Sequence, residues 1–229
     1  MLFEEISDKM NSLLRDRKSI KLLEAGCGSR SHFKFAPEVW SVGIDISKEQ
    51  LDRNQVIQEK ILGDLQSYPL PREEFDIVVC WDLVEHLSRP RDALRNMFQA
   101  TKPDGFVILG FPNLASFKGL VTKFSPFWFH ETFYRFMKYQ SHPFRTYLRF
   151  AVLPERVMMF AQENGLQVVY HRLIEGDMTR HFRERLLLAR ALFALIDLAA
   201  RIVSLGGIQS FHLDSCALIL RKDAQAPRA

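Results

Sequence analysis

Short apolar runs alternate with amphipathic segments along the first half of the chain. Five strands are predicted from the apolar runs, at residues 20–26, 40–47, 59–65, 75–82 and 106–112. Helical patterns occupy residues 48–58 and 89–102, and the sequence "PDG" at 103–105 is expected to end the second helix. Near-continuous apolar strands that alternate with helices are typical of a parallel sheet covered on both faces.

The second half predicts two further helices and two further strands. A helix at 153–165 has Gly165 as its stop, and a long apolar helix covers 183–205. Strands are predicted at 166–175 and 214–222. The N-terminus has helical periodicity as well, and its apolar face comprises Phe3, Ile6, Met10 and either Leu13 or Leu14. The sequence contains no internal repeat and no interdomain linker, so residues 1–229 are interpreted as a single α/β domain.

A glycine loop follows the first predicted strand. In "LLEAGCG" the acid Glu24 precedes Gly26 and Gly28, a pattern used by proteins that bind nicotinamide dinucleotides and by proteins that bind S-adenosylmethionine. The dinucleotide fingerprint requires a third glycine and a long helix after the loop. Ser31 takes the third glycine position, and Pro37 interrupts the segment where the helix should form. A nicotinamide-dependent oxidoreductase is therefore disfavoured.

The blocks that follow carry a resemblance to one enzyme family. In chain order they read "LLEAGCG", "VGIDIS", "LGDL", "FDIVVCWDLVEHL" and "KPDGFVILGFPN". Together they resemble the class I S-adenosylmethionine-dependent methyltransferases, closely from about Lys21 to Asn113 and by element order alone in the last third. The resemblance implies a Rossmann-like, doubly wound, mostly parallel seven-stranded sheet. It also implies S-adenosylmethionine as the cofactor and S-adenosylhomocysteine as its product.

The resemblance carries over a set of cofactor-binding positions. These are Glu24, Gly26, Cys27, Gly28, Asp45, Ile46, Gly63, Asp64, Leu65, Trp81 and Asp82. Glycines let the backbone approach the ligand, and backbone amides suit its carboxylate. Asp45, at a strand end, is expected to accept both ribose hydroxyls, and Asp64 the adenine amino group.

The remaining members of this set have less specific roles. The Leu65 amide is expected to face a ring nitrogen of adenine, and Ile46 to pack on the adenine face. Trp81 and Asp82 leave the fourth strand near the expected sulfonium, although Trp81 is equally compatible with a place in the core. Arg30 departs from the family pattern, which commonly has a further glycine at this position.

Three histidines are candidates for catalysis. His86, in "DLVEHL", follows the fourth strand, and an imidazole there could take the proton of a hydroxyl acceptor or contact the acceptor. Its alternative role is to cap the following helix or to bond within the wall of the site. His130 and His142 are rival bases in the segment after the fifth strand.

That segment carries the information on the acceptor. Residues 117–150 contain 12 of the chain's 27 aromatic residues, with six Lys or Arg and one Glu. In the related family this region helps to close the acceptor pocket, so residues 113–150 are interpreted as a lid over a small lipophilic, aromatic or lipid-linked acceptor. Oxygen is favoured over nitrogen as the accepting atom. The alternative is an insert that packs a core of its own.

The apolar helix at 183–205 has a narrow polar seam. Arg183, Arg190, Asp197 and Ser204 recur at heptad spacing. Charges within the segment argue against a membrane span. Burial against the lid is the favoured role, ahead of a homodimer interface or peripheral contact with a membrane surface.

Composition limits the remaining function classes. The net charge of +4 does not indicate nucleic acid, and "WDLVEH" stands where base-methylating relatives carry an Asn- or Asp-Pro-Pro-aromatic motif. Three widely spaced cysteines predict neither a disulfide framework nor a metal site. With no signal-peptide pattern, the expected location is cytoplasmic, with peripheral contact at the inner membrane surface as an option. A non-catalytic Rossmann-like binding protein remains the alternative, favoured by Arg30 and opposed by Asp45 and Asp64.

Overall fold

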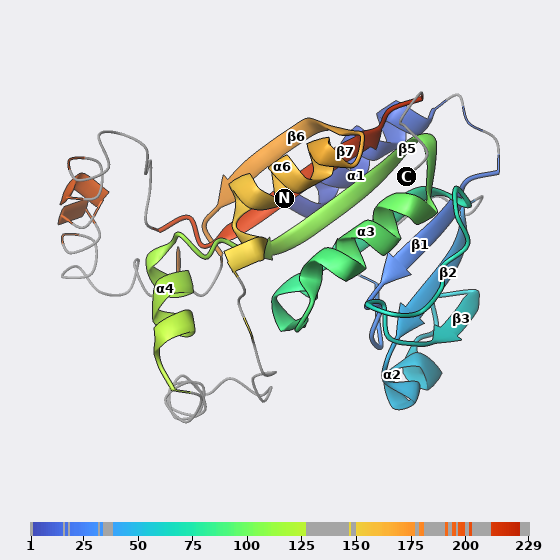
Figure 1. Ribbon diagram of the computed structural model, residues 1–229, viewed down its shortest axis with the longest axis horizontal. Coiled ribbons are helices and arrows are strands. Elements are labelled where there is room, and N and C mark those ends of the chain that lie inside the picture. Colours follow the sequence, from blue (N-terminus) through green and yellow to red (C-terminus); the bar gives the residue numbers. More distant parts are fainter. Residues whose placement is uncertain are drawn as a thin grey trace.

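The computed structural model is built around one seven-stranded sheet (Figure 1). It describes residues 2–15, 17, 19–31, 33, 39–126, 147, 150–176, 179–180, 191, 194–195, 197–199, 202 and 212–224. The strands are β1 (Lys21–Ala25), β2 (Trp40–Asp45), β3 (Glu59–Leu62), β4 (Phe75–Trp81), β5 (Thr101–Pro112), β6 (Leu166–Ile174) and β7 (Ser215–Lys222). Their order across the sheet is β3-β2-β1-β4-β5-β7-β6.

The predicted mostly parallel, doubly wound sheet is confirmed. Strands β1 to β5 pair in parallel, and β7 runs antiparallel between β5 and β6. It follows that β6 ends, and β7 begins, at the edge where the five parallel strands have their carboxyl ends. Chain segments that leave the sheet after β5 and after β6 therefore both emerge at this edge.

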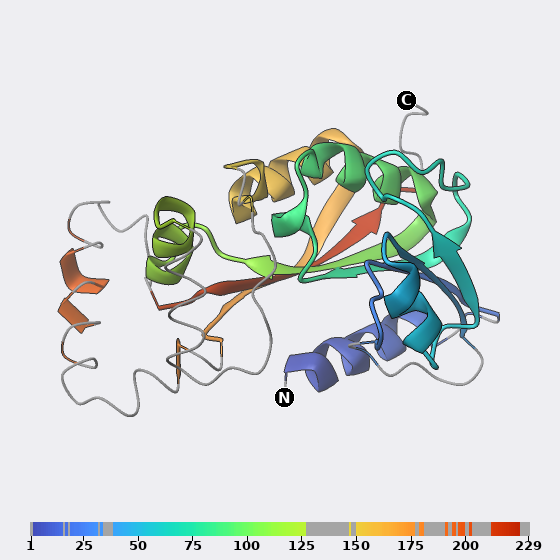
Figure 2. The ribbon, with the colours of Figure 1, turned by 90° about the horizontal axis from the view of Figure 1, so that it is seen from below.

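Helices cover both faces of the sheet, as Figure 2 shows. They are α1 (Leu2–Leu14), α2 (Lys48–Arg53), the 3₁₀ helix η1 (Val84–His86), α3 (Pro90–Ala100), α4 (Phe117–Phe124), the 3₁₀ helix η2 (Phe150–Val152) and α6 (Pro154–Glu163). Alternate residues of β4 point to opposite faces. Ile77 and Val79 pack in one buried cluster with Ile6 and Met10 of α1, while Val78 and Cys80 pack with residues of α3 and α6.

Two predicted boundaries are wrong, and both errors have local causes. The helix predicted at 48–58 ends at Arg53, because Asn54 has an extended backbone and its N–H closes the last turn on Gln50 and Leu51. The "PDG" sequence does not lie between a helix and a strand: α3 ends at Ala100 and β5 begins at Thr101. The expected stop at Gly165 is confirmed by its left-handed φ of 74°, which glycine adopts without strain.

Several sequence predictions concern residues outside the described part of the chain. They include most of the predicted lid and, in the long apolar helix, Arg183, Arg190 and Ser204; His130 and His142 lie outside it too. Cys27, Cys80 and Cys216 are free and buried. Among the described residues, the structure contains no helix long and apolar enough to cross a membrane.

Candidate functional site

The candidate site lies at the carboxyl edge of the sheet, where β1 has β2 on one side and β4 on the other. The chain passes from β1 through β2 and β3 and then returns to β4, so the direction of winding reverses between β1 and β4. Open α/β sheets bind ligands outside the strand ends at such a reversal. The loops after β1, β2, β3 and β4 are therefore the ones to consider.

The loop after β1 approaches its neighbours too closely for side chains. Gly26 and Gly28 have φ values of 71° and 51°, which belong to the left-handed region. A Cβ on Gly26 would lie 2.8 Å from Leu83, and one on Gly28 would lie 2.8 Å from Gln50. Arg30, just beyond, is exposed. The loop therefore packs closely against Leu83 and Gln50 at the carboxyl edge of the sheet.

The side chain of Asn54 stabilises this loop through hydrogen bonds. Its buried side-chain amide donates to the carbonyls of Cys27 (3.3 Å) and Gly28 (3.1 Å), while its oxygen accepts the amides of Val56 and Ile57 at 3.0 and 3.1 Å. Asn54 could not be predicted from the sequence, because its partners are adjacent only in the fold. It fixes the shape of the glycine loop.

The side chains of Glu24 and Cys27 lie beneath the loop, in the interior. The Cys27 thiol packs beside Leu51 and Ile57, and a Cβ on Gly43 would meet its sulfur at 2.7 Å. Burial, followed by the charges of Asp45 and Glu24, raises the pKa of Cys27 to about 12, so the thiol remains protonated at neutral pH. Any contact of Cys27 with a ligand would fall to its backbone.

Asp45 ends β2 and faces the glycine loop. Its Oδ2 accepts the amide of Gly28 at 3.0 Å and its Oδ1 accepts that of Ser47 at 2.8 Å. Each carboxylate oxygen keeps acceptor capacity beyond one hydrogen bond. The next residue, Ile46, is 74% exposed. Asp45 and Ile46 therefore lie where the sequence placed them.

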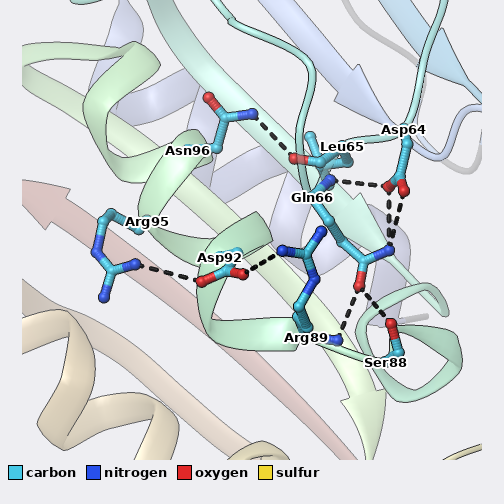
Figure 3. A network of polar contacts seen from close by, with 8 residues as sticks. All are labelled: Asp64, Leu65, Gln66, Ser88, Arg89, Asp92, Arg95 and Asn96. Carbon is cyan, nitrogen blue, oxygen red and sulfur yellow. Dashed lines mark hydrogen bonds and ion pairs between the residues drawn. The ribbon is translucent and has the colours of Figure 1, made fainter.

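The loop after β3 is fastened to the start of α3 (Figure 3). Asp64 accepts from the backbone amide of Gln66 at 2.9 Å and from its side-chain amide at 3.1 and 3.2 Å. The Gln66 oxygen in turn accepts from the Ser88 hydroxyl and the Arg89 amide, at 3.1 and 2.8 Å. This bridge fixes the Asp64 carboxylate at the end of β3.

Asn96 completes the same attachment from α3. Its side chain donates to the carbonyl of Leu65 at 2.9 Å (Figure 3) and to that of Tyr68 at 2.7 Å. Gly63 allows this packing, since a Cβ there would lie 2.6 Å from the Tyr68 ring. Leu65 is buried, so its amide, not its side chain, is the group available for the predicted contact. Neither Gln66 nor Asn96 was predicted from the sequence.

Trp81 and Asp82 diverge at the end of β4. The Trp81 ring is buried, meets Phe33 edge-to-face at a centroid distance of 5.4 Å, and lies against the backbone of Gly110. Of its two predicted roles, this position favours the one in the core. Asp82 is exposed and has a left-handed φ of 50°. Such strained positions cluster at functional sites.

The 3₁₀ helix η1 then places a buried carboxyl group beside His86. Glu85 is 3% exposed, and its Oε2 has no hydrogen-bond partner among the described residues. Burial, and secondly the charge of Asp82, raises the Glu85 pKa to about 8. The His86 Nε2 lies 3.8 Å from Glu85 Oε1. The sequence directed attention to the histidine, but the structure shows the perturbed group to be Glu85.

The segment after β5 contacts the rest of the protein near both of its ends. The amide of Tyr147 donates to the carbonyl of Glu85 at 2.9 Å, so the chain returning from the predicted lid lies against η1. At the other end of the segment, buried Asp214 pairs with Lys118 of α4 at 3.0 Å. Asp214 also accepts from the Thr179 hydroxyl at 2.7 Å and from the Gly176 amide. Asp214 therefore joins α4 to the segment that follows β6.

Comparison with known proteins identifies the part of the chain that carries this site. Residues 23–109 match the family model described as a methyltransferase domain. A mitochondrial ubiquinone biosynthesis O-methyltransferase from Schizosaccharomyces pombe is 30% identical over 117 residues, which are 44% of this chain and 42% of that relative. The chain thus spans less than half the length of the curated relatives it matches.

Solved structures extend the similarity to nearly the whole chain. The fold matches a putative sarcosine dimethylglycine methyltransferase from Galdieria sulphuraria with a TM-score of 0.60 and 12% identity, over 98% of this chain and 85% of that one. It also matches an S-adenosylmethionine-dependent methyltransferase from Archaeoglobus fulgidus with a TM-score of 0.57 and 19% identity, over 96% and 94%. At these identities the likeness concerns the fold.

Proposed function

Residues 23–109 of this chain form a class I S-adenosylmethionine-dependent methyltransferase domain, and on this premise we propose that the protein transfers a methyl group to the oxygen of a small lipophilic acceptor. One observation carries the proposal. The glycine loop after β1 and the acids that end β2 and β3 meet at one edge, with the Gly28 amide bonded to Asp45.

The residues at this edge fit S-adenosylmethionine. Gly26 and Gly28 give the loop after β1 a left-handed backbone that other residues adopt only with strain, so this loop can turn tightly beside a ligand. Asp45 would hold the ribose hydroxyls with the acceptor capacity that its two amide bonds leave over. Exposed Ile46 would cover one face of adenine, and Asp64 would accept from the adenine amino group.

The chain's own residues would align the acceptor and take its proton. When bound, S-adenosylmethionine supplies an electrophilic methyl group on a positively charged sulfur, so alignment of the acceptor and exclusion of water dominate catalysis. A hydroxyl acceptor must also lose its proton, and His86 is our candidate for accepting it. Below its pKa of about 8 the neighbouring Glu85 is neutral, so its carboxyl group adds no negative charge beside the imidazole.

The segment after β5 supports a lipophilic acceptor. It is rich in aromatic and basic residues, and its described end at Tyr147 contacts the site through the Glu85 carbonyl, while α4 is held beside the start of β7 by the Lys118–Asp214 pair. Lys123 of α4 lies 4.3 Å from the centroid of the Phe150 ring, a cation–π pair. Similarity to a relative named as a ubiquinone biosynthesis O-methyltransferase supports oxygen as the accepting atom.

A methyl-transfer assay tests the proposal. The purified chain would be incubated with methyl-labelled S-adenosylmethionine and with lipophilic phenols or their matched amines, and the products identified by mass spectrometry. We expect methylated phenols, and we expect His86→Asn to lower kcat by about a hundredfold or more with unchanged cofactor affinity. Preferred methylation of the amines would contradict the assignment of oxygen. Tight cofactor binding without methylation of any acceptor would instead favour the non-catalytic alternative.

A further inference from the structure

One helix of this protein turns an uninterrupted apolar face to solvent. Between residues 191 and 202 the described residues other than Asp197 are Ala191, Ala194, Leu195, Leu198, Ala199 and Ile202, all of them helical and exposed. Their spacing of three and four residues places them on a single helix face. Leu195, Leu198 and Ile202 are 64%, 56% and 67% exposed. This set of six residues is called the apolar face below. The sequence favoured burial of this helix, and that prediction is wrong for these residues.

The polar side of the same helix is anchored to the protein. Asp197, which is not part of the apolar face, lies 2.8 Å from Nδ1 of His212, just before β7. The helix is thus held through its polar side while its apolar side points away. An exposed apolar face of this kind marks a site that binds another protein or a membrane.

The charges in the surrounding sequence indicate the sign of the charge that this binding partner should carry. Residues 180–202 contain five arginines against Glu184 and Asp197, and residues 117–150 contain six Lys or Arg against one Glu. The chain as a whole has a net charge of only +4, so the remainder is net acidic. A second copy of the chain would bring like charges together, whereas an anionic lipid surface attracts them.

The position of the apolar face suits a membrane surface that delivers the acceptor. The helix and α4 lie at the same end of the molecule in both views (Figures 1 and 2). Both belong to segments that leave the sheet at the carboxyl edge, which also holds the candidate site. Phe124 of α4 is exposed, and so is Phe150 of η2, whose ring lies beside Lys123 of α4. Aromatic and basic side chains are enriched where proteins meet lipid headgroups.

We propose that the apolar face of residues 191–202 binds peripherally to an anionic lipid bilayer, lying in its interface without crossing it. The arginines would contact the headgroups while Leu195, Leu198 and Ile202 enter the acyl boundary. Binding of this type scales with buried apolar area and weakens with salt. The proposal does not depend on methyl transfer, because it concerns a surface outside the candidate site.

Vesicle flotation tests the proposal with two double variants, in each of which two apolar residues are replaced by uncharged glutamine. Leu195→Gln with Leu198→Gln removes two apolar side chains from the face and keeps residues that favour helix. Val56→Gln with Met159→Gln is the matched control, since these side chains are 60% and 58% exposed on other elements. Vesicles are made of phosphatidylcholine alone or mixed with phosphatidylglycerol. S-adenosylmethionine binding is measured on the same preparations to report the fold and the cofactor site separately.

We expect the unchanged chain and the control to float with phosphatidylglycerol vesicles and to be released by salt. The Leu195 and Leu198 double variant should bind the vesicles at least about tenfold more weakly, with its cofactor affinity unchanged. Absence of binding to phosphatidylglycerol vesicles would overturn the proposal, and so would equal binding of both double variants. A dimer that dissociates in the leucine variant, without vesicle binding, would instead assign the face to a second copy.

Discussion

Replacing Glu85 by glutamine tests the electrostatics of the candidate site most sharply. The carboxyl group is buried, and Oε2 has no hydrogen-bond partner within the part of the chain that the structure describes. Glutamine has nearly the same shape but no ionisable proton. The comparison between Glu85 and glutamine therefore isolates the free energy of ionising a buried acid at the end of β4.

The sign and size follow from the Glu85 pKa. In the folded protein it is raised from 4.5 to about 8, first by burial and then by Asp82. Between these values the folded chain holds a proton that the unfolded chain has released, so stability falls as pH rises. The favourable contribution is fully present below pH 4.5 and is lost through pH 8. From pH 5 to pH 8 the loss attributable to this group amounts to about 3 kcal/mol.

Urea denaturation of the unchanged chain and of Glu85→Gln at pH 5 and pH 8 measures this loss. We expect the glutamine variant to gain about 3 kcal/mol relative to the unchanged chain between the two pH values. Glu163→Gln, at the exposed end of α6, reports the effect of the same substitution on the surface. A relative stability of Glu85→Gln that does not change with pH would refute the assignment of a raised Glu85 pKa.

Three further substitutions test the packing around the site. Gly110→Ala should cost about 1–3 kcal/mol of stability in thermal unfolding, because its Cβ would lie 2.2 Å from the Trp81 ring; a neutral effect would show that the ring can move. Asn54→Ala should weaken S-adenosylmethionine binding in calorimetry by removing both bonds to the glycine loop, and unchanged affinity would contradict its role there. Asp214→Ala should raise the acceptor KM and leave cofactor affinity unchanged, since it frees Lys118 of α4; an effect on the cofactor alone would contradict this.

The sheet could be predicted from the sequence because its strands carry their own signal. Residues 75–81 are almost continuously apolar and every one of them is buried, as expected for a central parallel strand. Gly165 likewise marked a helix end through its conformational freedom. The end of α2 was missed, because the apolar pattern continues past Arg53 while Asn54 leaves the helix to brace another loop.

The candidate site was predictable only in part, for a physical reason. Asp45 and Asp64 lie at strand ends that the apolar pattern reveals, so their positions in the fold could be predicted. Asn54 and Gln66 act through hydrogen bonds to segments more than 20 residues away, which no local pattern records. Glu85 is a similar case, because its raised pKa depends on burial that only the fold creates.

The exposed helix at 191–202 illustrates a different limit. An apolar stretch in a sequence predicts that the stretch is covered, but not by what. Burial within the same chain was the natural expectation, yet Leu195 and Leu198 face solvent in the structure. The apolar pattern of a chain does not show which partner or surface outside the chain covers an apolar stretch.

Calorimetric titration with S-adenosylmethionine, on the unchanged chain and on Asp45→Ala, tests the central claim most directly. Asp52→Ala, in the exposed ion pair with Lys48 on α2, is the control for loss of a nearby acid. We expect saturable binding that falls about tenfold to a hundredfold in Asp45→Ala and is unchanged in Asp52→Ala. Equal affinity of all three proteins, or no binding to the unchanged chain, would contradict the assignment of the cofactor site to this edge of the sheet.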